Sequence, residues 1–272
     1  MLAIKNNSMA ENAARHVSAS YDALSKSVER LSSGLRINSA KDDAAGLAVR
    51  ELMRADIAVI KQGSRNANDG VSMLQTMEGA MGAIDGALIR MKELAEQAAT
   101  GSYSSGQRLI MDSEFQQMMS EITRIAGDTQ FNTIHLLDSA NSSNSSTIHF
   151  GVGSSITINS VDVTASALGI ASMSLTTAAL AEAALNAVTT AITRKDSARA
   201  SFGYMMNRLD STSKVLDIQA ENLMASESRI SDVDVASEMA SLTRNQVLSQ
   251  AGVAMLSQAN AMPQMALTLL RG

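Results

Sequence analysis

A heptad repeat of apolar residues near the start of the chain limits what the chain can fold into. The residues alternate spacings of four and three: Val17, Tyr21, Leu24, Val28, Leu31 and Leu35. This alternation is typical of a coiled-coil seam rather than of the broader apolar stripe of a helix on a globular protein. We therefore expect a helix over residues 1–33 that packs along a partner helix. A lone amphipathic helix on its own domain is the alternative.

The last 40 residues predict that partner. No charged residue lies between Arg244 and Arg271. An apolar residue recurs every seven positions at Leu248, Met255, Met262 and Leu269, with Val253 and Leu256 beside them. The Gln and Asn residues in between make the segment too polar for lipid. A helix over about 232–270 should therefore be buried against other protein helices.

Two stretches should connect these terminal helices to the middle of the chain. Gly34 is a helix stop signal, and Ser39 followed by Asp42 and Asp43 is a helix start signal, because the N–H groups and dipole of a first turn favour such residues. We expect the next helix to begin near Ala40. Ser231, followed by Asp232 and Asp234, repeats the signal after a break in the helical pattern at residues 226–231. The predicted connectors are residues 34–43 and 226–231.

The segment between the connectors, residues 44–225, is mostly helical in pattern. The helix from about 44 to 100 either is continuous or breaks near residues 62–64 or 68–70, where glycines lie. A shorter helix is expected over 107–125 and another over 175–226. Around 131–170 the period changes to two, and residues 146–150 and 156–161 flank a Gly/Ser turn, which predicts a β-hairpin. The predicted fold is mainly α: an elongated helical rod with a terminal two-helix coiled coil plus an antiparallel helical bundle and a small β-hairpin region.

Composition narrows the function. The chain has 272 residues, 3% aromatic residues, no Cys and a net charge of −5. These features exclude thiolate catalysis and disulfides and do not indicate a nucleic-acid surface. The three His residues are far apart, and a helix start already explains Asp42 and Asp43. We expect no catalytic, cofactor or metal site, no membrane span and no signal peptide. A rod with a charge-free C-terminal helix should form a homopolymer through head-to-tail contacts.

Four motifs resemble those of bacterial flagellins. They are LSSGLRINSAKDDAAGLAV at 31–49, RNANDGVSMLQTMEGAM at 65–81, GDTQFNTIHLL at 127–137 and ISDVDVASEMASLTRNQVLSQAGVAMLSQAN from 230. The resemblance is to a minimal flagellin with only the two inner domains. It implies a secreted structural subunit of the flagellar filament used for motility, exported by the type III apparatus. The hook–filament junction protein of the same superfamily is the alternative.

The resemblance also implies domains and partners. Residues 1–33 with 232–272 would form the inner tube, and residues 44–225 the outer tube. A flagellar export chaperone would bind the C-terminal helix, and filament cap and hook-associated proteins would meet the ends of the filament. Host flagellin receptors would recognise residues 29–50 in plants and the segment around Arg90, Leu94 and Glu114 in mammals, where the same residues are also bundle contacts.

Two further sets of residues complete the predictions. The subunit-assembly residues expected from the terminal heptads are Val17, Tyr21, Leu24, Val28, Leu31, Leu248, Val253, Met255, Leu256, Met262 and Leu269. Exposed hydroxyl groups in the Ser/Asn-rich loop are candidates for O-glycosylation, as is common in the family: Ser142, Ser143, Ser145, Ser146 and Thr147. Two N-glycosylation patterns in the same loop are more simply explained as a solvated loop.

Overall fold

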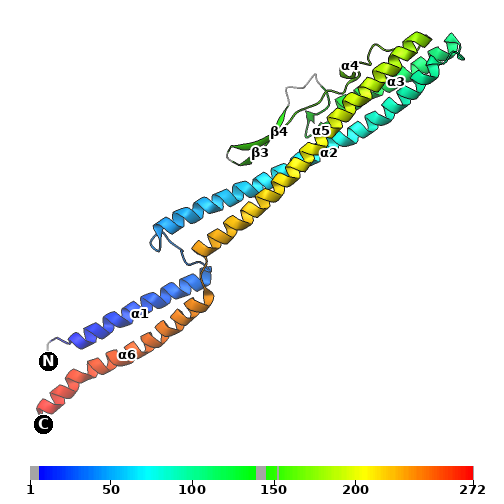
Figure 1. Ribbon diagram of the computed structural model, residues 1–272. Helices are drawn as coiled ribbons and strands as arrows, with labels where there is room; N and C mark the ends of the chain where they lie inside the picture. Colours follow the sequence, from blue (N-terminus) through cyan, green and yellow to red (C-terminus); the bar gives the residue numbers. More distant parts are fainter. Residues whose placement is uncertain (1–5, 139–144, 152, 272) are drawn as a thin grey trace. The chain divides into compact units, whose positions relative to one another are not determined.

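The computed structural model describes residues 6–138, 145–151 and 153–271 and divides the chain into two compact units (Figure 1). The first unit holds Met1–Ile57 and Glu221–Gly272, and the second holds Ala58–Ala220. The helices are α1 (Ser8–Ser33), α2 (Ala44–Ala99), α3 (Ser105–Asp128), α4 (Ala165–Leu168), α5 (Ala178–Ser231) and α6 (Val235–Arg271). The strands are β1 (Gln130–Phe131), β2 (Ile134–His135), β3 (Ser146–Gly151) and β4 (Ser154–Ile158). The prediction of a mainly helical fold with a small hairpin is confirmed.

The second unit is built around α2, which runs without a break through both places where the sequence left one open. Its glycines there receive the hairpin. A Cβ atom on Gly63 would lie 2.6 Å from the carbonyl oxygen of Phe150, and one on Gly70 would lie 3.2 Å from Ile148. The Asn66 amide donates a hydrogen bond to the His149 carbonyl oxygen at 2.9 Å. The glycines at which the sequence suggested a break in the helix are therefore the positions where β3 packs against α2.

The predicted hairpin is confirmed as an antiparallel pair of β3 and β4. Thr147 pairs with Thr157 and Ile148 with Ile156, and the register shifts between His149 and Gly151. The pair of β1 and β2 was not predicted. Each strand has only two residues, and the turn between them has positive φ at Asn132 and Thr133. The turn contains no Gly, so the usual sequence signal for a hairpin was missing.

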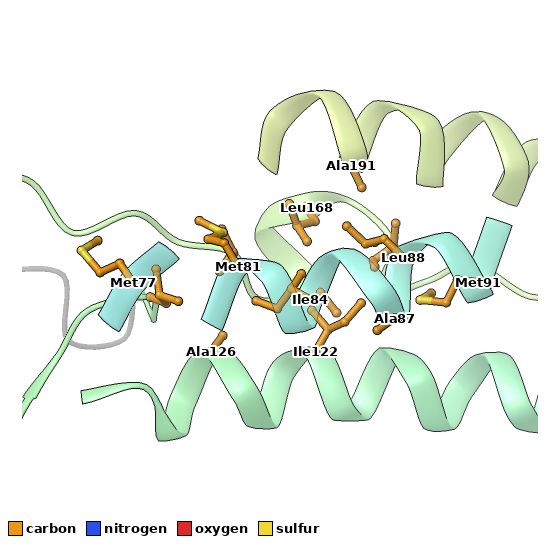
Figure 2. Close-up of a cluster of buried hydrophobic side chains, with 14 of the residues drawn as sticks. Met77, Met81, Ile84, Ala87, Leu88, Met91, Ile122, Ala126, Leu168 and Ala191 are labelled. Atoms are coloured by element: carbon orange, nitrogen blue, oxygen red, sulfur yellow. The ribbon is translucent and has the colours of Figure 1, made fainter. Parts of the chain in front are cut away.

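The core of the second unit lies between its helices (Figure 2). Methionines fill it where helices meet at irregular distances, and alanines let the helices approach. Figure 2 shows α2 contributing the largest share, with α3, α4 and α5 closing the cluster: Met77, Met81, Ile84, Ala87, Leu88 and Met91, with Ile122, Ala126, Leu168 and Ala191.

Ion pairs join α2 to α5 beside this core. The Lys195 side chain is buried and pairs with Asp85 and, at 2.8 Å, with Asp196. Burial lowers the pKa of Lys195, but hydrogen bonds to Asp196 and Asp85 outweigh burial, so the pKa is raised. Arg199 pairs with Glu78 at 3.3 Å. Both interhelical pairs fit one antiparallel register of α2 against α5.

The predicted helix starts are wrong by a few residues. α2 begins at Ala44, not near Ala40, and the Asp43 carboxylate accepts the Gly46 N–H at 2.9 Å. α5 continues to Ser231, so the predicted connector at 226–231 is helical. Asp234, not Ser231, caps α6 by accepting the Ala236 N–H at 3.0 Å. Ser and Asp are about equally good N-caps, so a run that contains both does not identify the capping residue.

A matched pair of variants tests the close contact between the hairpin and α2. Gly63→Ala should lower the free energy of unfolding by about 1–3 kcal/mol, because backbone atoms of Phe150 must move away from the new methyl group. Gly79→Ala, at a helical position with no atom within 4 Å of the added Cβ, should instead raise it by up to about 1 kcal/mol. Urea unfolding measures both, and equal effects of the two substitutions would contradict the close contact at Gly63.

Candidate assembly interface

The first unit contains α1 and α6 as an antiparallel pair (Figure 1). Contacts at increasing positions in α1 meet decreasing positions in α6. The Asn7 side-chain amide donates to the Ala259 carbonyl oxygen at 2.8 Å, Val17 packs on Gly252, and Arg30 faces Glu238 at 3.6 Å. The predicted pairing of the two terminal helices is therefore confirmed.

Small residues form the seam between these helices. Ser27 and Ser249 are buried, and a Cβ atom on Gly252 would lie 2.6 Å from Cγ2 of Val17. Small side chains allow two helix backbones to approach closely. The half-buried residues that continue the seam repeat every three or four positions on each helix: Ala13, Val17, Ser20, Leu24 and Leu31, with Leu242, Asn245, Gly252, Leu256 and Ala259.

This seam differs from the predicted one. Val17, Leu24, Leu31, Leu256 and Met262 are half-buried in the single chain. In contrast, Tyr21 and Val28 are 51% and 52% exposed, and Leu248, Val253 and Met255 are also exposed. The side chain of Leu269 lies outside the described side chains. The predicted seam is therefore correct for Val17, Leu24 and Leu31 and wrong for Tyr21 and Val28, because Ser20 and Ser27 take those two places in the contact.

The large apolar residues of α1 and α6 that lie outside this seam face outward, and we call this set the assembly surface. It consists of the exposed apolar side chains of α1 and α6: Met9, Tyr21, Val28, Val235, Met239, Val247, Leu248, Val253, Met255 and Met265. Covering one such side chain stabilises an interface by about 1.5–3 kcal/mol. Since α6 has no charged residue from 245 to 270, burial of that part of the helix by neighbouring protein does not require desolvation of a charge.

The connectors hold the base of the helix pair. Gly34 adopts a left-handed conformation with φ of 73° and ends α1. Leu35 and Asp232 then form an antiparallel bridge, in which the Arg36 N–H donates to the Ser231 carbonyl oxygen at 2.6 Å and the Val233 N–H donates to Gly34 at 3.0 Å. The two chain crossings are thus hydrogen-bonded to each other.

Side chains pack tightly around the first connector. Ile37 is buried, and its carbonyl oxygen accepts a hydrogen bond at 2.8 Å from the guanidinium of buried Arg50. A Cβ atom on Gly46 would lie 2.7 Å from Cδ1 of Ile37 and 2.5 Å from Oδ2 of Asp43. Sequence reasoning missed Ile37 and Arg50, and the single apolar residue within a polar stretch was the signal that could have indicated Ile37.

Asp42 ties this connector to α1. Lys26 pairs with its carboxylate at 2.7 Å, and the N–H groups of Ser39 and Asn38 donate to it at 3.1 and 3.3 Å. Lys26, helped by the Ser39 and Asn38 hydrogen bonds, holds the pKa of Asp42 well below its ordinary range and outweighs the opposite effect of desolvation. The connector is therefore anchored by a carboxylate that stays ionised to low pH.

The residues predicted for receptor recognition lie in the second unit. Arg90 pairs with Glu114 at 2.8 Å and with Glu93 at 3.1 Å, and these two carboxylates raise the pKa of Arg90. Both Arg90 and Glu114 are accessible, whereas Leu94 is only 2% exposed. Leu94 is therefore a bundle contact and is not on the surface of the chain.

The candidate glycosylation sites are only partly described. Ser145 and Thr147 are exposed, and Ser146 is half-buried at the start of β3. Ser142 and Ser143 lie outside the described residues. Over the described ranges, His, Asp and Glu side chains nowhere form a group of three or more that could hold a metal ion. In the same part of the chain, no helix has the length and hydropathy needed to cross a lipid bilayer.

Comparison with known proteins gives one result for both ends of the chain. Residues 4–142 match the bacterial flagellin N-terminal helical region, and residues 185–270 match the bacterial flagellin C-terminal helical region. The flagellin of Halalkalibacterium halodurans is 42% identical and that of Bacillus subtilis 39% identical, in each case over 98% of this chain and 99% of the relative.

Two solved structures are similar as well. The crystal structure of Bacillus cereus flagellin aligns with a TM-score of 0.51 and 33% identity, over 60% of this chain and 94% of that one. A Vibrio parahaemolyticus chain assigned to the flagellar hook-associated proteins aligns with a TM-score of 0.60 over 70% of this chain and all of that one. Its identity is 15%, so this second likeness shows a shared fold alone.

Asp42 gives a pH-dependent prediction. Because its pKa is depressed in the folded chain, its contribution to stability is present above its ordinary pKa of about 4 and is lost as the pH falls below that value. Asp42→Asn should therefore destabilise the first unit at neutral pH, and the difference from the parent chain should shrink as the pH is lowered through about 4 to 2. Urea unfolding across this range, with exposed Asp56→Asn as the control, measures the effect. A difference independent of pH would contradict the anchoring role.

Proposed function

The chain belongs to the bacterial flagellin family and is a structural, non-enzymatic subunit of the extracellular flagellar filament, and we propose that its copies join through the assembly surface of α1 and α6. The observation that carries this proposal is the position of the large apolar residues. The seam between the two helices encloses Leu24, Leu31 and small residues such as Ser27, but it leaves side chains such as Tyr21, Leu248 and Met255 uncovered. A filament supplies neighbours for such a surface at every subunit.

Charge supports the same assignment. Surface helices normally carry charged residues on their solvent side, but residues 245–270 carry none. Gln and Asn supply the polarity of this segment, and they can hydrogen-bond to neighbouring copies without the desolvation cost of burying a charge. In our proposal α1 and α6 form the inner tube of the filament, and the helical bundle of α2, α3 and α5 forms the outer tube.

A role as the hook–filament junction protein is less well supported. The two flagellin relatives match this chain over nearly their whole length at 42% and 39% identity. The hook-associated chain shares only the fold, at 15% identity. We place the hook-associated proteins and the filament cap among the partners, at the two ends of the filament.

A charge placed on the assembly surface should stop assembly. Leu248→Asp should abolish elongation from filament seeds, because each added subunit would bury an unpaired carboxylate. Leu248→Met keeps an apolar side chain of similar size and should elongate like the parent chain. Electron microscopy of seeded samples and pelleting of filaments measure both. Normal filaments from Leu248→Asp would show that α6 does not make this contact.

The same surface fits an export chaperone before assembly. A subunit that is not yet in a filament exposes α6, which needs an apolar groove or a helical partner to keep it from aggregating. We propose that a flagellar export chaperone binds the charge-free part of α6. The chaperone should bind the full chain, fail to bind a variant that lacks residues 235–272, and bind Leu248→Asp more weakly. Calorimetry measures the three affinities, and undiminished binding of both variants would rule out this chaperone site.

The proposed segments for host recognition lie one in each unit. We propose that the mammalian Toll-like flagellin receptor contacts the exposed ion pair of Arg90 and Glu114, and that Leu94 acts only by supporting the helix beneath it. A plant receptor that reads residues 29–50 would meet a segment whose Ile37 and Arg50 are buried, so we expect it to act on chain fragments rather than on folded subunits.

The ion pair makes this testable. Glu114→Gln should lower receptor signalling by about tenfold, because it breaks a charge-assisted hydrogen bond that orients Arg90. Glu121→Gln is the matched control on the same helix, since Glu121 pairs with Arg124 rather than with α2. Reporter-cell assays with purified subunits give the readout, and an equal response to both variants would exclude Glu114 from the contact.

A further inference from the structure

The most exposed and the most buried methionines lie in different units. Among the described residues, each methionine that is well exposed lies in the first unit: Met9, Met224, Met239, Met255 and Met265. Each one that is buried lies in the second unit, with an exposed fraction of at most 8%: Met73, Met77, Met81, Met91, Met111 and Met119. Figure 2 shows Met77, Met81 and Met91 of the second group inside the core.

This division matters because methionine is the oxidation-prone residue of the chain. There is no Cys, so the thioethers are the most readily oxidised side chains present. Susceptibility follows access of the oxidant to sulfur, and four accessible methionines belong to the assembly surface: Met9, Met239, Met255 and Met265. Met224 is also exposed but lies on α5, outside that surface.

We propose that Met9, Met239, Met255 and Met265 are sites of reversible sulfoxidation that control whether a subunit can enter a filament. The oxidant is a peroxide, with hydrogen peroxide as the simplest member. This inference rests on the proposed function, because it requires that α1 and α6 meet other copies through these side chains. It adds a chemical modification that acts on the unassembled subunit.

The reaction balances without any group from the protein other than the thioether. The sulfur lone pair attacks one peroxide oxygen, the O–O bond breaks, and an S–O bond forms. Sulfur is oxidised by two electrons, and the departing hydroxide takes up the proton that the transferred oxygen releases, so the products are the sulfoxide and water. A methionine sulfoxide reductase reverses the change with two electrons from a dithiol, which becomes a disulfide.

The physical effect follows from the position of these residues. A sulfoxide is polar and is a strong hydrogen-bond acceptor, whereas the thioether it replaces is apolar. On the assembly surface that acceptor must be buried against a neighbouring copy. The stretch 245–270 has no Lys or Arg, so only amide and hydroxyl groups can donate to this acceptor there, and burial removes the water that solvates it. Oxidised subunits should therefore fold, since the core methionines are protected, but should add poorly to a filament.

The first experiment measures selectivity. The purified, unassembled full chain is treated with dilute hydrogen peroxide, and peptide mass spectrometry follows the gain of one oxygen atom at each methionine. Met9, Met239, Met255 and Met265 should react at least about tenfold faster than Met77, Met81 and Met91. Equal rates for the two groups would overturn the proposal. Circular dichroism should show the helical content unchanged after the fast group has reacted.

The second experiment measures assembly. Oxidised parent chain should elongate seeds at least about fivefold more slowly than untreated chain, because each contact then buries a polar acceptor in place of an apolar thioether. Treatment with methionine sulfoxide reductases and dithiothreitol should restore elongation. The quadruple variant M9L, M239L, M255L and M265L should resist peroxide, whereas the matched control Met224→Leu should stay as sensitive as the parent.

The outcomes separate this inference from the proposed function. If Leu248→Asp stops elongation but oxidised parent chain elongates normally, the methionine proposal fails and the assembly surface stands. If both elongate normally, the assembly surface itself is wrong. If the quadruple variant does not elongate even without peroxide, the reductase treatment of the oxidised parent chain becomes the test. Restored elongation then supports the methionine proposal, and absence of recovery overturns it.

Discussion

The close approach of α1 to α6 is the constraint on which the rest of the first unit depends. Gly252 leaves no room for a Cβ atom against Val17, and buried Ser27 and Ser249 continue this narrow seam. Ser20 and Ser27 lie beside Leu24 and Leu31 in this seam, so the neighbouring Tyr21 and Val28 face outward. A subunit paired in this way still has an exposed apolar surface, and this is the surface that we propose to be buried between copies in the filament.

The second unit keeps its long helices in one register although the chain has few aromatic residues. Methionine and alanine fill its core, and buried Lys195 with Asp85 fits only one alignment of α5 on α2. The hairpin adds a second fixed point, since Gly63 and Gly70 admit β3 directly against the helix backbone. Paired connectors at Leu35 and Asp232, with Asp42 held by Lys26, fix the base of the helix pair in the first unit.

Much of this could be predicted because helices and hairpins have strong local signals. The 3,4 repeats, Gly34 and the β-branched runs around 148 and 156 predicted α1, α6, the end of α1 and the hairpin. What failed depended on tertiary contacts. Gly63 costs helix stability unless a strand packs on it, and Ser39 and Asp43 are equally good caps in isolation. The sequence analysis placed Tyr21 and Val28 in the seam instead of Ser20 and Ser27, because counting apolar residues gives no weight to Ser. The exposure of Met255 and the burial of Met81 likewise follow from partners that the sequence does not identify.

The central claim is that the seam through Val17 and Gly252 lies within one chain and that the exposed apolar residues of α1 and α6 make contacts between chains. A filament structure determined by electron cryo-microscopy, at a resolution that shows side chains, tests it most directly. We predict that Val17 packs on Gly252 of the same chain, while Tyr21, Val28, Leu248, Val253 and Met255 are buried against neighbouring copies. A filament in which these five side chains remain in solvent, or in which Val17 packs on Gly252 of another copy, would contradict the account.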